Sequence, residues 1–160
     1  MQVLRDQMPV PCPAIQFSGG EPTLRKDLSE IVFLARKMGF TQIQVATNGI
    51  MLAVKPDLCK DLVHSGLSTI YLQFDGVTPE PYKAIRGCDL LPAKLRAIEN
   101  LRAAGQHSIV LVPTLVKGTN DSQVGDIVKF ASKNLEIVKG INYQPVSFTG
   151  RIDQEERAAK

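Results

Sequence analysis

Short apolar runs alternate with amphipathic stretches along the 160-residue chain. The first run, residues 14–17, ends at a Ser-Gly-Gly turn, and apolar side chains then recur with helical spacing from Leu24 to Met38. Gly39 follows at the position where a glycine commonly ends a helix. This order of strand, polar turn, helix and glycine predicts the first unit of a repeating pattern.

The same unit recurs along the rest of the chain. Strands are expected to start near residues 14, 42, 69, 108 and 140, and the last two are expected to extend to 115 and 146. Helices are expected over about 55–65, 79–104 with a break near Arg86 and Gly87, and 121–133. Such spacing is typical of βαβ units, and strands joined through helices must be parallel. The sequence therefore predicts an α/β fold with about five parallel strands.

The composition limits the class of protein. A length of 160 residues with 44% hydrophobic content is enough for one domain with a single core. A formal charge of +3, without a run of Lys or Arg, argues against a nucleic-acid partner. Unbroken apolar runs fall far short of the roughly 20 residues that cross a bilayer, and no secretory pattern opens the chain. We expect a soluble, cytoplasmic protein.

Cysteine and histidine do not form a recognisable metal or disulfide pattern. Cys12, Cys59 and Cys88 lie far apart and make no C-x-x-C pair, so neither a disulfide framework nor a zinc site is indicated. His64 and His107 are also isolated, and we expect all five side chains to be structural or solvated.

The turns that follow the strands are the expected ligand site. In a parallel sheet every strand ends on the same side, and ligands bind just beyond those ends. The polar side chains that these turns supply are Glu21, Asn48, Gln73, Asp75 and Gln144.

The first of these turns, Gly19-Gly20-Glu21-Pro22, indicates the charge of the ligand. Glu21 would repel a phosphate, and Pro22 lacks one of the N–H donors that a phosphate needs. Two glycines let backbone carbonyls come close to a ligand, and the carboxylate can accept from an ammonium group. A primary amine therefore fits better than a phosphate, although a plain tight turn with a helix-starting proline is the alternative.

Five segments in this order resemble the radical S-adenosylmethionine (SAM) superfamily, over about residues 10–151. They are Ile15–Arg25 (IQFSGGEPTLR), Val45–Gly49 (VATNG), Gln73–Gly76 (QFDG), Tyr82–Gly87 (YKAIRG) and Val116–Asn120 (VKGTN). Within the superfamily, the segments Pro9–Pro13 (PVPCP) and Asn142–Arg151 (NYQPVSFTGR) most resemble archaeal members near the tetraether lipid synthases. More distantly, the chain resembles the GTP cyclase of molybdenum cofactor synthesis.

The resemblance implies the fold and the chemistry of a parent enzyme. Members cleave SAM reductively at a [4Fe-4S] cluster, giving a 5′-deoxyadenosyl radical. Their core is a (βα)6 partial barrel, of which this chain would hold five strands and lack the first strand and the cluster loop. On this basis residues 1–13 are the remnant of a preceding helix, 14–151 the core, and 152–160 the start of a truncated C-terminal segment.

The resemblance also implies a SAM site built from the turns after the strands. The residues carried over are Gly19, Gly20, Glu21 and Pro22 for the methionine amino group, Thr47 and Asn48 for the pocket wall, Gln73 and Asp75 for the carboxylate or ribose, and Leu115, Val116 and Gln144 for the adenine.

One departure from the family concerns the cluster. Three thiolates in a C-x-x-x-C-x-x-C loop before the GGEP turn hold the cluster, whereas Cys12 is the sole cysteine before Gly19. We therefore expect a fragment that is inactive by itself and binds neither cluster nor SAM. The parent would use a ferredoxin- or flavodoxin-type electron donor and a small-molecule or lipid substrate.

The missing first strand would leave an exposed sheet edge, which favours self-association. Two other functions remain open from the residues alone. One is a non-catalytic (βα) module that binds SAM or a nucleoside. The other is a partial-barrel hydrolase or aldolase that uses Asp75 and Glu21 as a carboxylate pair.

Overall fold

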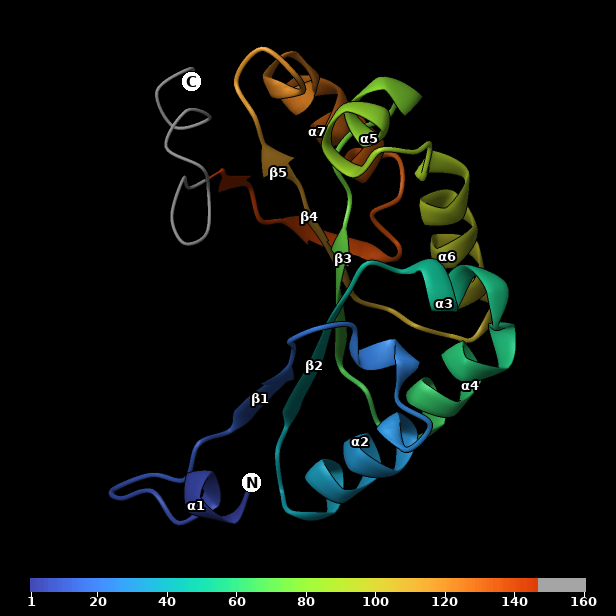
Figure 1. The fold of residues 1–160 in the computed structure, drawn as a ribbon. Helices are drawn as coiled ribbons and strands as arrows, with labels where there is room; N and C mark the ends of the chain where they lie inside the picture. Colours follow the sequence, from blue (N-terminus) through green and yellow to red (C-terminus); the bar gives the residue numbers. More distant parts are fainter. Residues whose placement is uncertain (147–160) are drawn as a thin grey trace.

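Five parallel strands form a twisted sheet in the order β1-β2-β3-β4-β6 (Figure 1). The computed structural model describes residues 1–146. The strands are β1 (Ala14–Phe17), β2 (Gln42–Thr47), β3 (Thr69–Gln73), β4 (Ile109–Val112), β5 (Thr114–Leu115), β6 (Val138–Ile141) and β7 (Gln144–Pro145). The pair β5-β7 forms a second, two-stranded parallel sheet. The predicted α/β fold with five parallel strands is confirmed.

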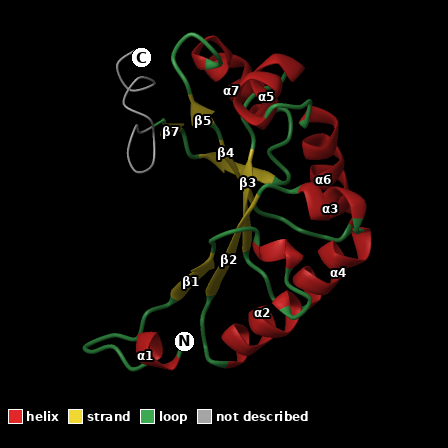
Figure 2. Ribbon diagram, in the orientation of Figure 1, coloured by secondary structure: helices red, strands yellow, loops and turns green. Residues whose placement is uncertain are grey.

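Helices α2 to α7 lie on one side of the main sheet, whereas α1 lies apart from them, near the start of β1 (Figure 2). The α-helices are α1 (Gln2–Arg5), α2 (Leu28–Lys37), α3 (Ile50–Val54), α4 (Pro56–His64), α5 (Pro79–Arg86), α6 (Leu91–Ala103) and α7 (Val124–Ser132), and the 3₁₀ turns are η1 (Pro22–Leu24) and η2 (Asp121–Gln123). Strand order follows chain order, and no helix of residues 1–146 covers the other sheet face, which is the arrangement of a partial (βα) barrel.

Strand alternation divides the side chains between the two faces. On β2, Ile43 and Val45 are fully buried toward the helices, whereas Gln44 and Ala46, which alternate with them, are only half-buried and face the open side. The register pairs Val45 with Ile70 on β3, so that apolar residues meet across the strands on the helix side. Successive side chains of a strand point to opposite faces, which explains a dry core on one side and a ligand-accessible surface on the other.

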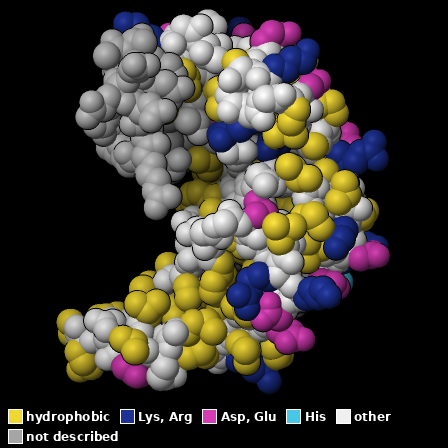
Figure 3. Space-filling model, viewed as in Figure 1, with side chains coloured by type: hydrophobic (Ala, Val, Ile, Leu, Met, Phe, Trp, Pro, Cys, Tyr) yellow, Lys and Arg dark blue, Asp and Glu magenta, His cyan; other side chains and the backbone are white. Residues whose placement is uncertain are grey.

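The open side is concave, and hydrophobic side chains gather there around the N-terminal segment (Figure 3). Val3, Met8 and Val10 are exposed in this segment. Within the described residues β1 pairs with β2 alone, so its other edge carries unpaired backbone groups. Such an edge can pair with another chain, and the predicted self-association stays a prediction.

The first helix begins later than its apolar pattern predicts. The pattern places Leu24 on the helix face, but Leu24 is 66% exposed and lies in η1. The Glu21 carboxylate accepts from the Thr23 N–H and caps this 3₁₀ turn, and Arg25 then takes an extended conformation. The chain is thereby redirected, so that α2 starts only at Leu28.

The predicted strand over 108–115 is interrupted at Pro113. β4 ends at Val112, and the chain continues as β5, which pairs with β7 instead of extending the main sheet. Proline cannot donate to a sheet ladder, which accounts for the break. The last predicted strand, 140–146, is likewise two pieces, β6 and β7, and β6 begins at Val138.

Two further predictions concern the ends of the chain. The predicted segment 152–160 and the final residues of the predicted core lie outside the described residues.

In the part of the chain that the structure describes, no helix combines the length and the apolar character that a membrane crossing would need.

Candidate functional site

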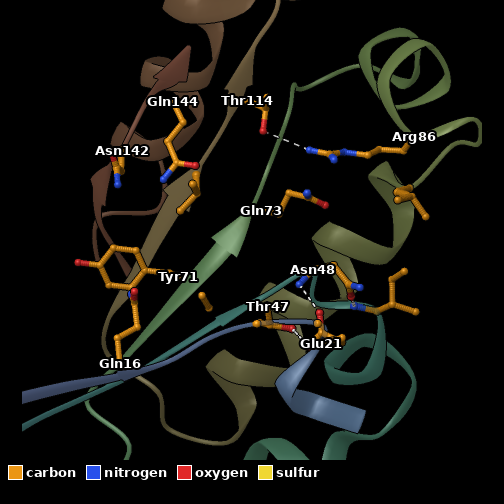
Figure 4. A pocket seen from close by; sticks show the side chains of 16 residues that line it. Gln16, Glu21, Thr47, Asn48, Tyr71, Gln73, Arg86, Thr114, Asn142 and Gln144 are labelled. Atoms are coloured by element: carbon orange, nitrogen blue, oxygen red, sulfur yellow. Dashed lines mark hydrogen bonds between the residues drawn. The ribbon is translucent and has the colours of Figure 1, made fainter. Parts of the chain in front are cut away.

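A cavity of about 560 Å³ opens on the concave side, at the carboxyl ends of the strands. Its lining comes from the turns after β1 and β2, the inner faces of the strands, α5 and the segment around β7 (Figure 4). The lining residues are Gln16, Gly19, Gly20, Glu21, Ala46, Thr47, Asn48, Ile50, Tyr71, Gln73, Arg86, Leu90, Val112, Thr114, Asn142 and Gln144. The cavity lies beyond the strand ends, where the ligand site is predicted, and binding of a ligand there stays a prediction.

Gly19 and Gly20 present bare backbone to the cavity. Their φ angles are +94° and +50°, a region that side-chain-bearing residues rarely adopt. A Cβ at either position would meet no atom within 4 Å, so the space beside each backbone is open. The peptide groups of this turn are therefore accessible to a ligand.

Glu21 is held by four hydrogen bonds from neutral donors. Its Oε1 accepts from the Thr23 N–H at 3.1 Å, the Thr23 hydroxyl at 2.6 Å and the Thr47 hydroxyl at 2.7 Å, and its Oε2 accepts from the Asn48 N–H at 2.8 Å. Burial alone would raise the pKa of Glu21, but these hydrogen bonds outweigh it and lower the pKa below its ordinary value. The carboxylate is thus charged and fixed at the edge of the cavity.

The turn after β2 brings Asn48 to Glu21. Gly49 has φ +78°, and a Cβ there would lie 2.4 Å from Leu72 Cδ1, so only glycine lets this turn pack against β3. The Gly49 N–H donates to Thr47 Oγ1 at 3.0 Å, which orients the hydroxyl toward Glu21.

Arg86 lines the cavity and is positioned by a buried carboxylate. Its Nε donates to Asp75 Oδ2 at 2.9 Å and its Nη2 to Asp75 Oδ1 at 3.3 Å and to Thr114 Oγ1 at 3.2 Å. Asp75 is fully buried and also accepts from the Thr114 N–H at 3.0 Å, whereas the Arg86 side chain is 28% exposed. Asp75 therefore neutralises and orients a guanidinium that faces the cavity.

The Gln73 side-chain amide lies between two cations. With its oxygen turned toward Arg86 it accepts from Nη2 at 2.7 Å and Nη1 at 3.2 Å, and in the opposite orientation the oxygen lies 3.4 Å from Lys94 Nζ. Lys94, on α6, has no exposed surface, and its ammonium also donates to the Asn48 carbonyl. Burial lowers the pKa of Lys94 to about 8; Asp75 opposes this shift and Arg86 adds to it.

Seven of the eleven predicted site residues line the cavity. They are Gly19, Gly20, Glu21, Thr47, Asn48, Gln73 and Gln144.

The other four predicted residues lie outside the lining. Pro22 is buried at the start of η1, and Leu115 pairs with Pro145 in the small sheet. The Val116 N–H donates to Asn120 Oδ1 within its own loop. Asp75, predicted to contact a ligand directly, lies behind the cavity wall. Its ion-pair partner Arg86 lines the cavity instead.

Sequence reasoning missed several functional candidates. Three of them, Gln16, Arg86 and Asn142, stand in segments that carry the resemblance but have no predicted role, and Tyr71 carries no motif. Lys94 had a detectable signal, because it occupies the buried stripe of α6 that Ala97, Ile98 and Leu101 continue.

The described residues do not fit an iron–sulfur cluster. Cys12 is half-buried beside β1, Cys59 is buried on α4, and Cys88 is exposed after α5. Burial raises the pKa of Cys59 to about 11, which disfavours the thiolate that a metal needs. Across residues 1–146 no three Cys, His, Asp or Glu side chains gather where a metal could bind.

Comparison with known proteins identifies relatives over almost the whole chain. The sequence model of the radical SAM superfamily matches residues 2–131. The chain is 56% identical over 155 residues to the 7,8-dihydro-6-hydroxymethylpterin dimethyltransferase of Methanocaldococcus jannaschii, which covers 97% of this chain and 30% of that protein. It is 31% identical over 140 residues to the GTP 3',8-cyclase of Listeria monocytogenes, covering 85% of this chain and 40% of that protein.

Among solved structures, a domain of pyruvate-formate lyase-activating enzyme from Bacteroides vulgatus has a similar fold. The TM-score is 0.68 at 14% identity, over 91% of this chain and 88% of that one. These findings confirm the expected likeness to the GTP cyclase, and the likeness to tetraether lipid synthases stays a prediction. The chain spans about 30% to 40% of the length of these two curated relatives.

Proposed function

The chain belongs to the radical SAM superfamily, and we propose that it is the SAM-binding core of an enzyme that modifies a pterin-class substrate. The observation that carries the SAM part is that the cavity presents hydrogen-bond acceptors on one side and donors on the other. Glu21 with the Gly19-Gly20 backbone offers acceptors, and Arg86 offers donors. An amino acid zwitterion, such as the methionine end of SAM, requires both.

In this proposal the α-ammonium group of SAM binds beside Gly19, Gly20 and Glu21, and its carboxylate binds Arg86. Thr47 and Asn48 keep the Glu21 carboxylate oriented, and Asp75 keeps the guanidinium oriented. When bound, SAM supplies a sulfonium carbon–sulfur bond that one electron can cleave. The residues of this chain bind and orient; none of them is assigned a proton transfer.

We derive no step through an iron–sulfur cluster, because the described residues do not fit one. The cysteine triplet would come from a part of the parent protein outside these 160 residues, and an electron donor of the ferredoxin or flavodoxin type would supply the electron. The 160-residue chain alone is then expected to bind SAM without cleaving it, which departs from the expectation that it binds none.

The substrate proposal is supported by the relative that is 56% identical, whose name states action on a dihydropterin. The inner face of the sheet offers Gln16, Tyr71 and Asn142 at the cavity, away from Arg86 (Figure 4). Amide groups can hydrogen-bond to the edge of a pterin ring, and a tyrosine ring can stack on its face. This part of the cavity is the proposed substrate side.

A hydrolase that uses Glu21 and Asp75 as a pair of free carboxylates is disfavoured. Asp75 has no exposed surface, and both of its oxygens accept hydrogen bonds from Arg86. A carboxylate engaged in this way does not reach a water or a substrate in the cavity.

The SAM site is tested by isothermal titration calorimetry with SAM and with 5′-methylthioadenosine, which lacks the amino acid end. The wild-type chain should bind SAM at least about tenfold more tightly than 5′-methylthioadenosine, a difference of ~1.4 kcal/mol in binding free energy. Glu21→Gln should reduce this preference. Equal affinity for the two compounds, or no SAM binding, would contradict the proposed site.

The substrate side is tested by the fluorescence of 6-hydroxymethylpterin. Addition of wild-type chain should change its emission in a saturable manner, and Tyr71→Ala should weaken binding while SAM affinity is kept. An unchanged spectrum at saturating SAM would argue against a pterin-class substrate but leave the SAM site standing.

A further inference from the structure

Lys94 is a buried cation that the proposed binding scheme does not use. It has no exposed surface and shares its helix stripe with the apolar residues Ala97, Ile98 and Leu101. Burying a charged group is costly unless it is paired or hydrogen-bonded. The contacts of this ammonium group therefore indicate what the lysine does in the fold.

A chain of hydrogen bonds runs from Lys94 to Glu21 in one direction. The Lys94 ammonium donates to the carbonyl of the Asn48–Gly49 peptide. The N–H of the same peptide donates to Thr47 Oγ1 at 3.0 Å, and the Thr47 hydroxyl donates to Glu21 Oε1 at 2.7 Å. A cation stands at the donor end of this chain and an anion at its acceptor end.

We propose that Lys94 is a positioning residue for Glu21, acting through the Asn48–Gly49 peptide and the Thr47 hydroxyl. Hydrogen bonds that point the same way polarise one another, so that a charge at one end strengthens the last bond. Lys94 thereby holds the Glu21 carboxylate ionised and oriented toward the cavity without touching a ligand. Lys94 acts on Glu21 in the ligand-free protein as well, and only the consequence for SAM binding rests on the proposed function.

The charge of Lys94 is set by four neighbouring groups as well as by burial. Asp75, at the end of β3, favours the ammonium form, as do Glu21 and Cys88, whereas Arg86 on α5 disfavours it. Burial is the largest effect and lowers the pKa of Lys94 to about 8. A neutral amine is a weaker donor than an ammonium group, so the chain to Glu21 should weaken as the pH rises past this value.

The first test measures the titration of Glu21 by the ¹³Cδ chemical shift of the ligand-free 160-residue protein. Lys94→Met removes the cation with little change in volume and should raise the titration midpoint of Glu21. The matched control is Lys139→Met, because the exposed Lys139 ammonium also donates to main-chain carbonyls, those of Leu135 and Glu136. Equal midpoints for the two variants would overturn the proposal.

A double-mutant cycle tests the route. Thr47→Val breaks the chain in the middle and should also raise the midpoint of Glu21. If Lys94 acts through Thr47, the double variant should shift the midpoint by less than the sum of the two single shifts. Additive shifts would show that Lys94 acts independently of Thr47, and the proposed route would be wrong.

The wild-type protein provides a test that needs no folded Lys94 variant. The amide proton shift of Gly49, which belongs to the bridging peptide, should titrate with a midpoint near 8. The same titration in Cys88→Ser excludes the neighbouring thiol as its source. A Gly49 shift that stays flat between pH 6.5 and 9.5, or that vanishes in Cys88→Ser, would overturn the proposal.

Calorimetry separates this inference from the proposed function. Lys94→Met should weaken SAM binding about tenfold (~1.4 kcal/mol), and Lys139→Met should leave it unchanged. If wild-type chain binds no SAM, the proposed function fails, while the Glu21 and Gly49 titrations still decide the role of Lys94. If SAM binds equally to wild type and Lys94→Met, the proposal for Lys94 is overturned and the SAM site stands.

Discussion

Glu21 and Asp75 both follow strands of the same sheet, yet they are satisfied in opposite ways. Glu21 lies at the cavity edge and accepts four hydrogen bonds, all from neutral hydroxyl and N–H groups. Asp75 lies behind the cavity wall and accepts from the Arg86 guanidinium as well as from the Thr114 N–H. One carboxylate is held by dipoles and the other by a full opposite charge.

This difference in hydrogen-bond partners determines which of the two carboxylates is available to a ligand. The charge of Asp75 is cancelled within the chain, and what remains toward the cavity is the face of Arg86. The charge of Glu21 is oriented but not neutralised by a direct ion pair, so that this side of the cavity attracts a cation. Asp75 therefore has a structural role, whereas Glu21 stays available for the ligand recognition proposed above, although both are acids next to a strand end.

The largest expected effect comes from separating Asp75 from its partner. Arg86→Met leaves a buried carboxylate without its cation and should lower the free energy of unfolding by about 3–5 kcal/mol. Arg102→Met is the matched control, because Arg102 pairs with Glu136 on the exposed surface, and it should cost about 0.2–1 kcal/mol. Urea unfolding measures both; similar losses would show that the pair at Asp75 is not special.

The next largest effect concerns two glycines, one near Glu21 and one near Arg86, the partner of Asp75. Gly49 follows the turn that serves Glu21, and Gly87 follows Arg86; their φ angles are +78° and +79°. Gly87→Ala should cost only the backbone strain, roughly 1–2 kcal/mol. Gly49→Ala should cost about 2–5 kcal/mol, because its Cβ would also collide with Leu72 Cδ1. Thermal unfolding of the two variants isolates the packing contribution, and equal losses would exclude it.

Apart from the control variants, the smallest effect on stability is expected at Glu21. Glu21→Gln keeps the shape but weakens the hydrogen bonds, and should cost about 1–3 kcal/mol at pH 7. The folded pKa of Glu21 is lowered from 4.5, so its stabilising effect is present above the unfolded pKa and is lost as the pH falls through the folded pKa.

The lowered pKa of Glu21 predicts how the stability of the protein depends on pH. Wild-type stability should fall with acidification below about pH 4.5, and Glu21→Gln should show a shallower fall over the same window. Glu30→Gln, at an exposed position of α2, should keep the wild-type slope. Identical slopes for the wild type and Glu21→Gln would mean that the carboxylate is no better stabilised in the folded state than in the unfolded one.

The strands of this fold are predictable because their apolar runs are local, but some connecting elements are not. α3, Ile50–Val54, consists entirely of apolar residues, and five such residues carry no helical period against which a helix could be recognised. The break at Pro113 could have been read from the proline, whereas the partner that β5 then finds, β7, depends on the tertiary fold.

The residues of the site also fall into two groups, those predictable from the sequence and those placed by packing. Glu21, Asn48 and Gln73 could be predicted, because parallel strands bring all their carboxyl ends to one side. Arg86 and Lys94 belong to helices, and which way a helical side chain points into a site depends on how the helix packs on the sheet. The burial of Asp75 also depends on packing. Asp75 follows the end of β3 much as Asn48 follows the end of β2, but Asn48 lines the cavity whereas Asp75 is fully buried.

Strand alternation has a consequence for how such a domain can change over time. On β2 and β3 the helix-facing residues, such as Val45 and Leu72, carry the stability, while their immediate neighbours Ala46 and Tyr71 face the cavity. Side chains on the two faces point in opposite directions, so the effects of their substitutions on folding should be closer to additive than those of two substitutions on one face. The inner face can therefore be rewritten for a different molecule, residue by residue, while the core that supports it keeps its packing.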